Sequence, residues 1–229
     1  MDVSALPVLP AGIFRAYDIR GVVDQTLTEE GVYWIARAFA SEALDRGIHT
    51  AVVGRDGRLS GPRLLKALLK GLVDTGLQVI NIDLVPTPEL YFATHHFDTG
   101  TGIMLTGSHN PPDYNGLKMM MSGSTLSSEA ILGLKERLEQ GRLRQGQGGV
   151  QEACVHEAYI ERIGSVLTLS RPLKVVVDTG NGAAGVIAPR LLEALGAEVI
   201  PLFCEVDGHF PNHHPDPSNP KNMRTLIER

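Results

Sequence analysis

The sequence predicts an α/β protein of two consecutive domains with similar topology, each built on a mixed sheet layered between helices. Short apolar strands alternate with amphipathic helices along most of the 229 residues, which is the pattern of layered α/β folds. A polar, glycine-rich stretch at 141–149 interrupts this alternation and predicts a linker, so we expect domains at 1–150 and 151–229. The alternation resumes only briefly after the linker, and we therefore expect the second domain to be truncated.

Composition limits the classes of protein that fit. Hydrophobic residues make up 43% of the chain and charged residues 21%, enough for one large core or two modest ones. The net charge of −5 argues against nucleic acid as a partner, and no apolar run is long enough to predict a membrane span. Residues 1–10 lack the pattern of a secretory signal. The two widely separated cysteines, Cys154 and Cys204, indicate a reducing, cytoplasmic location and no zinc site.

Helix caps, apolar spacing and glycines predict the elements of the first domain. Thr28 is a favourable N-cap, and apolar residues at helical spacing follow it as far as Gly47, which predicts one helix. Residues 50–54 predict a strand, and the helix after it has Ser60 as a possible cap and Pro62 in its first turn. The other predicted elements are strands at 77–82, 102–106 and 117–121, and helices that open at 85–88 and at 127–128.

The second domain is predicted to hold helices at 156–169 and 186–195 and strands at 173–178 and 198–203, with another helix starting near 221. The turn at 180–185 has the spacing G-x-G-x-x-G, but this signal is weak by itself, and a structural turn is favoured over dinucleotide binding. The loop at 207–217 contains three histidines and two aspartates. Its prolines favour a rigid structural loop over a metal site.

The loop between the strands predicted at 102–106 and 117–121 carries an unusual serine. Gly107 is expected to allow a sharp turn before Ser108, and Pro111 to hold Asn110 extended. Asn115-Gly116 indicates a second turn, after which the next strand brings Lys118 back towards the serine. This is not the G-x-S-x-G elbow of hydrolases, because Asn110 stands where the second glycine should be.

Ser108 needs activation to act as a nucleophile, and the adjacent His109 does not form a triad with it. A phosphoserine is one interpretation: it would add about 1.5 to 2 negative charges, which Lys118, His109 and Asn110 could bind. An ordinary exposed serine on a proline-rich connector fits the loop chemistry equally well.

The loop sequence T-G-S-H-N-P-P-D-Y-N-G-L-K, at 106–118, strongly resembles the phosphoserine loop of the α-D-phosphohexomutases, in particular the bacterial phosphomannomutase/phosphoglucomutase branch. The stretch F-R-A-Y-D-I-R-G at 14–21 is similar to the N-terminal motif of that branch, and G-R-D-G-R-L-S-G at 54–61 also matches the family. The resemblance extends over essentially the whole chain, but it corresponds to roughly the first half of a family member.

The resemblance implies reversible phosphoryl transfer between C1 and C6 of mannose or glucose phosphates, through a phosphoserine and a 1,6-bisphosphate intermediate. The implied catalytic residues are Ser108, Lys118, Arg20 and His109, and the implied substrate-binding residues are Tyr17, Arg20, Asn110 and Lys118. It also implies Mg²⁺ bound through the phosphate on Ser108, with the remaining ligands on a loop, D-G-D-G-D-R, that this sequence lacks. The implied partners are hexose 1-phosphate, hexose 6-phosphate and hexose 1,6-bisphosphate, with no nucleic acid and no membrane, and we expect a monomer.

Two other interpretations stay open. A phosphoglucosamine mutase would carry an N-terminal motif closer to F-G-T-D-G-x-R-G, which is not found at 14–21. A non-catalytic sugar-phosphate-binding fragment is compatible with the missing acidic loop. Within the motif at 54–61, we expect Arg55 and Asp56 to pair with each other in support of the site, in preference to binding phosphate directly.

Overall fold

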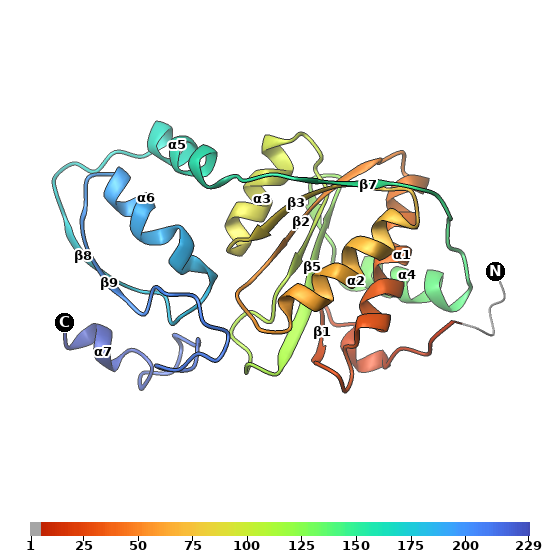
Figure 1. Cartoon of the computed structure of the whole chain (residues 1–229), viewed down its shortest axis with the longest axis horizontal. Coiled ribbons are helices and arrows are strands. Elements are labelled where there is room, and N and C mark those ends of the chain that lie inside the picture. Colours follow the sequence, from red (N-terminus) through yellow and green to blue (C-terminus); the bar gives the residue numbers. More distant parts are fainter. Residues whose placement is uncertain (1–5) are drawn as a thin grey trace.

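A computed structural model describes residues 6–229 and contains two α/β units, with the chain between them running along the edge of the first sheet (Figure 1). The first unit is a mixed sheet between layers of helices, as predicted. The second unit has a smaller, two-stranded parallel sheet with helices beside it. Within the described residues, no helix is long and apolar enough to cross a membrane.

The first sheet has seven strands in the order β1-β5-β4-β2-β3-β7, with the short β6 paired to β5. Its parallel part consists of β4, β2, β3 and β7, whereas β5 runs antiparallel to both β4 and β1. The strands are β1 (Ile19–Val22), β2 (Thr50–Arg55), β3 (Gln78–Leu84), β4 (Gly102–Leu105), β5 (Tyr114–Met121), β6 (Ser124–Thr125) and β7 (Gly149–Glu152).

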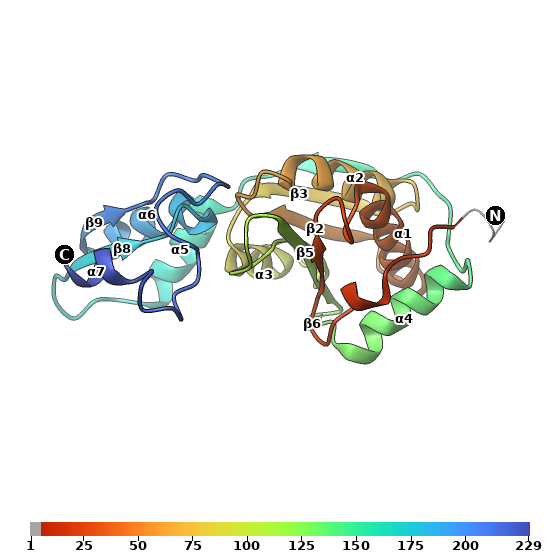
Figure 2. The same ribbon diagram turned by 90° about the horizontal axis from the view of Figure 1, so that it is seen from below.

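Two apolar clusters, one on each face of this sheet, form the core of the first unit. The larger is covered by α1 (Glu29–Asp45), α2 (Gly61–Val73) and α4 (Ser128–Glu139), and the smaller by α3 (Thr87–His96) (Figure 2). Helix α1 begins as predicted, because the Thr28 hydroxyl accepts a hydrogen bond from the Gly31 N–H at 3.0 Å.

The predicted turn at Asn115-Gly116 is wrong, because both residues lie inside β5. The Asn115 side chain donates to the Ser60 hydroxyl at 2.9 Å. The Ser60 side chain therefore does not cap α2, although the sequence made it a possible cap. At Gly116 a Cβ atom would lie only 2.3 Å from the carbonyl oxygen of Ile19. This glycine is therefore required by the close approach of β1, and not by a turn.

The glycine-rich stretch at 141–149 is bonded to the first unit along much of its length. Arg37 donates to the carbonyl oxygen of Arg144 at 2.7 Å, and the Gly148 N–H donates to that of Val73 at 2.8 Å. The chain then pairs with β3 as β7. The predicted domain boundary at 150 falls within β7, and its position stays a prediction.

The second unit contains α5 (His156–Val166), β8 (Lys174–Asp178), α6 (Ala188–Ala194), β9 (Glu198–Leu202) and α7 (Arg224–Ile227). The helix predicted after the glycine turn starts as a 3₁₀ segment, Ala183–Val186, before α6. In the turn itself, Asn181 adopts a φ of 58°, and its side-chain amide donates to the carbonyl oxygen of Glu205 at 2.8 Å.

Several contacts join the two units within residues 6–229. Near the start of α3, Nδ1 of His156 lies 2.8 Å from Oε1 of the fully buried Glu89, and Phe92 packs edge-on against Tyr159. Burial raises the pKa of the Glu89 carboxyl above its ordinary value of 4.5, and the hydrogen bond with His156 only partly opposes this. Elsewhere the loop after β2 meets the loop at 205–210, where a Cβ on Gly208 would lie 2.7 Å from the carbonyl oxygen of Gly57.

Glu89 predicts a dependence of stability on pH. The folded chain holds a proton on this carboxyl to a higher pH than the unfolded chain, so the free energy of unfolding should fall as the pH rises from 4.5 through the raised pKa. Urea unfolding between pH 4.5 and 8 should show that the free energy of unfolding falls less with pH in Glu89→Gln than in the wild type. Parallel curves for the variant and the wild type would contradict the assignment.

Candidate functional site

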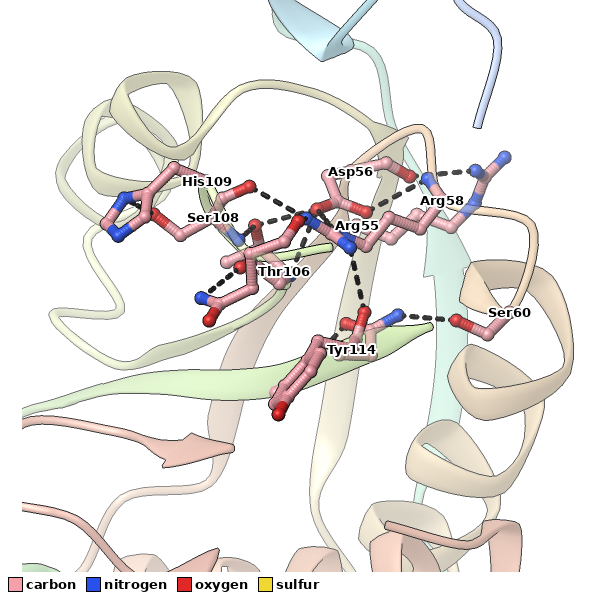
Figure 3. A network of polar contacts seen from close by, with 12 residues as sticks. Arg55, Asp56, Arg58, Ser60, Thr106, Ser108, His109 and Tyr114 are labelled. Atoms are coloured by element: carbon pink, nitrogen blue, oxygen red, sulfur yellow. Dashed lines mark hydrogen bonds and ion pairs between the residues drawn. The ribbon is translucent and has the colours of Figure 1, made fainter. Parts of the chain in front are cut away.

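The loop that carries Ser108 is held by one buried arginine. Arg58, on the loop between β2 and α2, has a fully buried side chain, and all five of its N–H donors are used (Figure 3). One nitrogen pairs with the Asp56 carboxylate at 3.2 Å. The other two donate to four carbonyl oxygens of the serine loop and its end: those of Ser108 at 2.8 Å, Asn110 at 2.7 Å, Tyr114 at 2.9 Å, and Pro111.

Asp56 fixes the beginning of the same loop. Its carboxylate accepts hydrogen bonds from the Thr106 hydroxyl at 2.8 Å and from the Gly107 N–H at 3.1 Å, besides its bonds with Arg58. Burial lowers the pKa of the Arg58 guanidinium, and the Asp56 carboxylate opposes that fall. The pair therefore keeps a buried charge satisfied while it fixes the path of the loop.

The predicted pairing of Arg55 with the Asp56 side chain is wrong. Arg55 reaches the Asp83 carboxylate at 2.7 Å, and only the backbone oxygen of Asp56 accepts from it. The carboxylate of Asp56 has Arg58 as its partner. The role of Arg58 as that partner was not predicted, because an arginine between a glycine and a leucine gives no sign of burial.

The left-handed residue of the loop is Ser108 and not Gly107. Ser108 has a φ of 54°, a conformation that residues with a Cβ rarely adopt, and its N–H donates to the Thr106 hydroxyl at 2.9 Å. Gly107 is needed for a different reason than the predicted turn. A Cβ there would lie 2.3 Å from both Cζ and Nε of Arg58.

His109 and Asn110 differ in how free their side chains are. His109 is exposed, and its Nδ1 lies 3.4 Å from the Ser108 hydroxyl. The side-chain amide of Asn110 donates to the carbonyl oxygen of Gly107 at 2.9 Å, so it closes the loop on itself. A role for either residue in binding phosphate stays a prediction.

Arg20 and Lys118 lie on the same face of the sheet. Arg20 pairs with Gly116 across β1 and β5, and Lys118 pairs with Met104 across β5 and β4. Residues opposite each other, and alternate residues along a strand, project from one face. Met104 belongs to the core under α3 and also lines the cleft beside Ser108, so this is the face on which the cleft opens.

The charged groups on this face are only partly paired among the described residues. Arg20 contacts the Asp18 carboxylate, and its buried Nε has no partner in residues 6–229. Within the same residues, the Lys118 side chain forms no ion pair and no hydrogen bond. Tyr17 is 74% exposed and is not among the residues that line the cleft beside Ser108.

A cavity of about 200 Å³ lies between the two units. The first unit contributes Thr106 and Ser108 to its lining, and the second contributes Ala183, Phe210 and Pro215. Ser108 therefore borders a space large enough for a small ligand, at the end of β4 where ligands commonly bind in α/β folds.

The described residues do not complete the magnesium site that the resemblance implies. No group of three or more His, Cys, Asp or Glu side chains suited to a metal ion occurs within residues 6–229. Asp56 lines the cleft, but its carboxylate is already bonded to Thr106, Gly107 and Arg58.

Gly107→Ala tests the steric arrangement of the loop. The new Cβ must displace a buried guanidinium, so we expect the free energy of unfolding to fall by about 1–3 kcal/mol. Gly133→Ala in α4 is the control: its Cβ meets nothing within 4 Å, and it should stabilise the chain by up to about 1 kcal/mol. Urea unfolding measures both, and equal stability of Gly107→Ala and wild type would refute the arrangement.

Comparison with known proteins agrees with this architecture. The family model for phosphoglucomutase/phosphomannomutase alpha/beta/alpha domain I matches residues 11–145, and the model for domain II matches residues 157–229. A crystal structure of a phosphoglucomutase/phosphomannomutase family protein from Burkholderia thailandensis superposes with a TM-score of 0.92 at 45% identity. That match covers 96% of this chain and 50% of the other.

Curated relatives give the same picture. The chain is 56% identical over 229 residues to the phosphomannomutase/phosphoglucomutase of Pseudomonas aeruginosa strain PAO1, and 50% identical over 217 residues to a phosphoglucomutase of Neisseria gonorrhoeae. All of this chain is matched in the first case and 94% in the second, but only 50% and 47% of the relatives, so the chain spans about half their length. Since the two domain models cover both α/β units, the chain belongs to the phosphoglucomutase/phosphomannomutase family.

Proposed function

We propose that this chain supplies the phosphoryl-carrying part of a phosphohexomutase that interconverts the 1- and 6-phosphates of mannose or glucose. The observation that supports this most is the fixed position of Ser108, which borders the cleft on a loop held by Asp56 and Arg58. A serine whose backbone is held in one place beside a small cavity suits phosphoryl transfer, in which positioning supplies much of the rate.

The proposed reaction has two half-steps. In the first, the bond between phosphorus and Oγ of Ser108 breaks while a bond forms to the free hydroxyl of a hexose monophosphate, giving the 1,6-bisphosphate; the sugar hydroxyl loses its proton and the serine regains one. In the second, the bond between the other phosphorus of the bisphosphate and its sugar oxygen breaks while a bond forms to Oγ of Ser108; the serine hydroxyl loses its proton and the sugar oxygen gains one. The product leaves with its phosphate at the other carbon, and the phosphoserine is restored.

The neighbouring cations have proposed roles that follow from their register. Arg20 and Lys118 share the face on which the cleft opens, and positive charge there would offset the negative charge of the transferring group. Lys118 is also our candidate for moving the proton of the sugar hydroxyl. His109 is proposed to orient the phosphoryl group from beside Ser108, and Tyr17 and Asn110 to bind substrate.

By resemblance to the phosphohexomutases, we also propose the ligands, the cofactor and the assembly state. The ligands are hexose 1-phosphate, hexose 6-phosphate and hexose 1,6-bisphosphate, the cofactor is Mg²⁺, and the enzyme works as a monomer in the cytoplasm. Relatives named for both glucose and mannose phosphates support either sugar as a substrate.

Ser108→Ala tests the covalent scheme. Removal of the hydroxyl leaves no atom to carry the phosphoryl group, so mutase turnover by the full gene product should fall by about three orders of magnitude or more. Ser170→Ala, at an exposed position away from the cleft, should retain activity. Turnover of a folded Ser108→Ala enzyme within a few-fold of wild type would exclude a phosphoserine carrier.

Lys118→Met tests the cation beside the cleft. The variant keeps the length of the side chain but loses its charge and proton, so kcat should fall by about 10²- to 10⁴-fold. Lys66→Met, on the exposed side of α2, is the matched control and should leave kcat unchanged. Steady-state kinetics of both variants measure the effect. A kcat of Lys118→Met equal to that of the wild type would show that Lys118 has no part in the mechanism.

A further inference from the structure

Arg58 contacts the serine loop in a way that only an arginine can. Its planar guanidinium presents five N–H donors in a fixed fork, and four of them reach carbonyl oxygens that belong to a segment of seven residues, 108–114. Lysine carries the same charge but has three donors and no plane, so it cannot hold these oxygens in one arrangement. The contact therefore fixes the backbone of the loop, and not only its charge.

This arrangement also decides which polar groups the loop offers to the cleft. The carbonyl oxygens of Ser108 and Asn110 are committed to Arg58, so these negative ends of the peptide dipoles are neutralised. Among the described residues, the backbone N–H of His109 donates to no backbone oxygen. A loop with occupied carbonyls and a free amide next to Ser108 favours an anion such as a phosphoryl group.

The second unit covers the other side of the guanidinium. The Phe210 ring lies 5.4 Å from Cζ of Arg58, within the range of a cation–π contact, and Phe210 also lines the cleft together with Ser108. Phe210 has a φ of 51°, which a bulky residue adopts only when its surroundings hold it there. Arg58 thus lies between the serine loop of one unit and an aromatic side chain of the other.

We infer that Arg58 is a positioning residue for phosphoryl transfer: it sets the backbone of residues 108–114 so that Ser108 presents its phosphoryl group to the cleft, and its contact with Phe210 ties that setting to the second unit. The inference rests on the proposed phosphoserine chemistry. It differs from a purely structural role, because it predicts a loss of turnover without a matching loss of substrate affinity.

Arg58→Lys in the full gene product is the main test. Since small misplacements of a reacting group cost about 10²-fold, kcat should fall by about a hundredfold while KM for hexose 1-phosphate stays within about threefold. Hydrogen exchange of the amides at 106–116 should become at least about tenfold faster. Arg63→Lys, an arginine in ion pairs on the surface of α2, is the matched control and should change none of these values.

Phe210→Leu provides a second test that does not depend on the folding of the Arg58 variant. The loss of the cation–π contact should lower kcat by about threefold to tenfold, with KM unchanged and faster exchange at 106–116. An unchanged kcat in Arg58→Lys would overturn the inference, and so would a change confined to KM. If Arg58→Lys does not fold, the same outcomes in Phe210→Leu would overturn it.

Phosphorus NMR of the wild-type protein separates this inference from the proposed function. A phosphoserine signal and mutase activity in the wild type, together with normal kcat in the variants, would overturn only the positioning role of Arg58. A wild type that never carries phosphoserine and lacks mutase activity would overturn the proposed function itself.

Discussion

The burial of one guanidinium, that of Arg58, determines the shape of the candidate site. Transfer of a charge from water into a protein interior is costly unless it is paired and hydrogen-bonded, and Arg58 meets this requirement through Asp56 and four backbone carbonyls. Those carbonyls belong to the serine loop, so the loop has little freedom to adopt another path. The need for glycine at 107 and the left-handed conformation of Ser108 accompany the same contact.

The sheet brings the parts of the site together. Asp56 directly follows β2 and Thr106 directly follows β4, and these strands are parallel neighbours, so both residues lie at the same edge. The antiparallel pairing of β5 with β4 and β1 then puts Lys118 and Arg20 on the face where the cleft opens. The second unit closes the opposite side of the cleft with its own loops, including Phe210.

Local signals in the sequence were sufficient for much of the fold. Thr28 caps α1 as predicted, and the apolar patterns located six of the nine strands in residues 6–229, because these features depend on neighbours along the chain. Strands β1, β6 and β7 were not predicted. The errors arose where distant residues decide the outcome. Asn115-Gly116 has the composition of a turn, yet it lies in a strand because Ser60 and the backbone of Ile19 approach it from elsewhere in the fold.

The candidate site divides in the same way. Ser108 and its loop could be identified from a run of residues that are contiguous in sequence, and family membership confirms that resemblance. The burial of Arg58 could not be predicted, because it depends on carbonyl oxygens some fifty residues away, such as that of Asn110. The ion pair between Arg55 and Asp83 could not be predicted either, because the two residues are distant in sequence.

The most direct test of this account follows the phosphoryl group itself. The full gene product, labelled with radioactive phosphate on Ser108, would be mixed with unlabelled hexose 1-phosphate and quenched within one turnover. The account predicts that the label leaves the protein and appears in hexose bisphosphate and hexose 6-phosphate. Label that stays on the protein while hexose 6-phosphate forms would contradict the claim that Ser108 carries the transferred group.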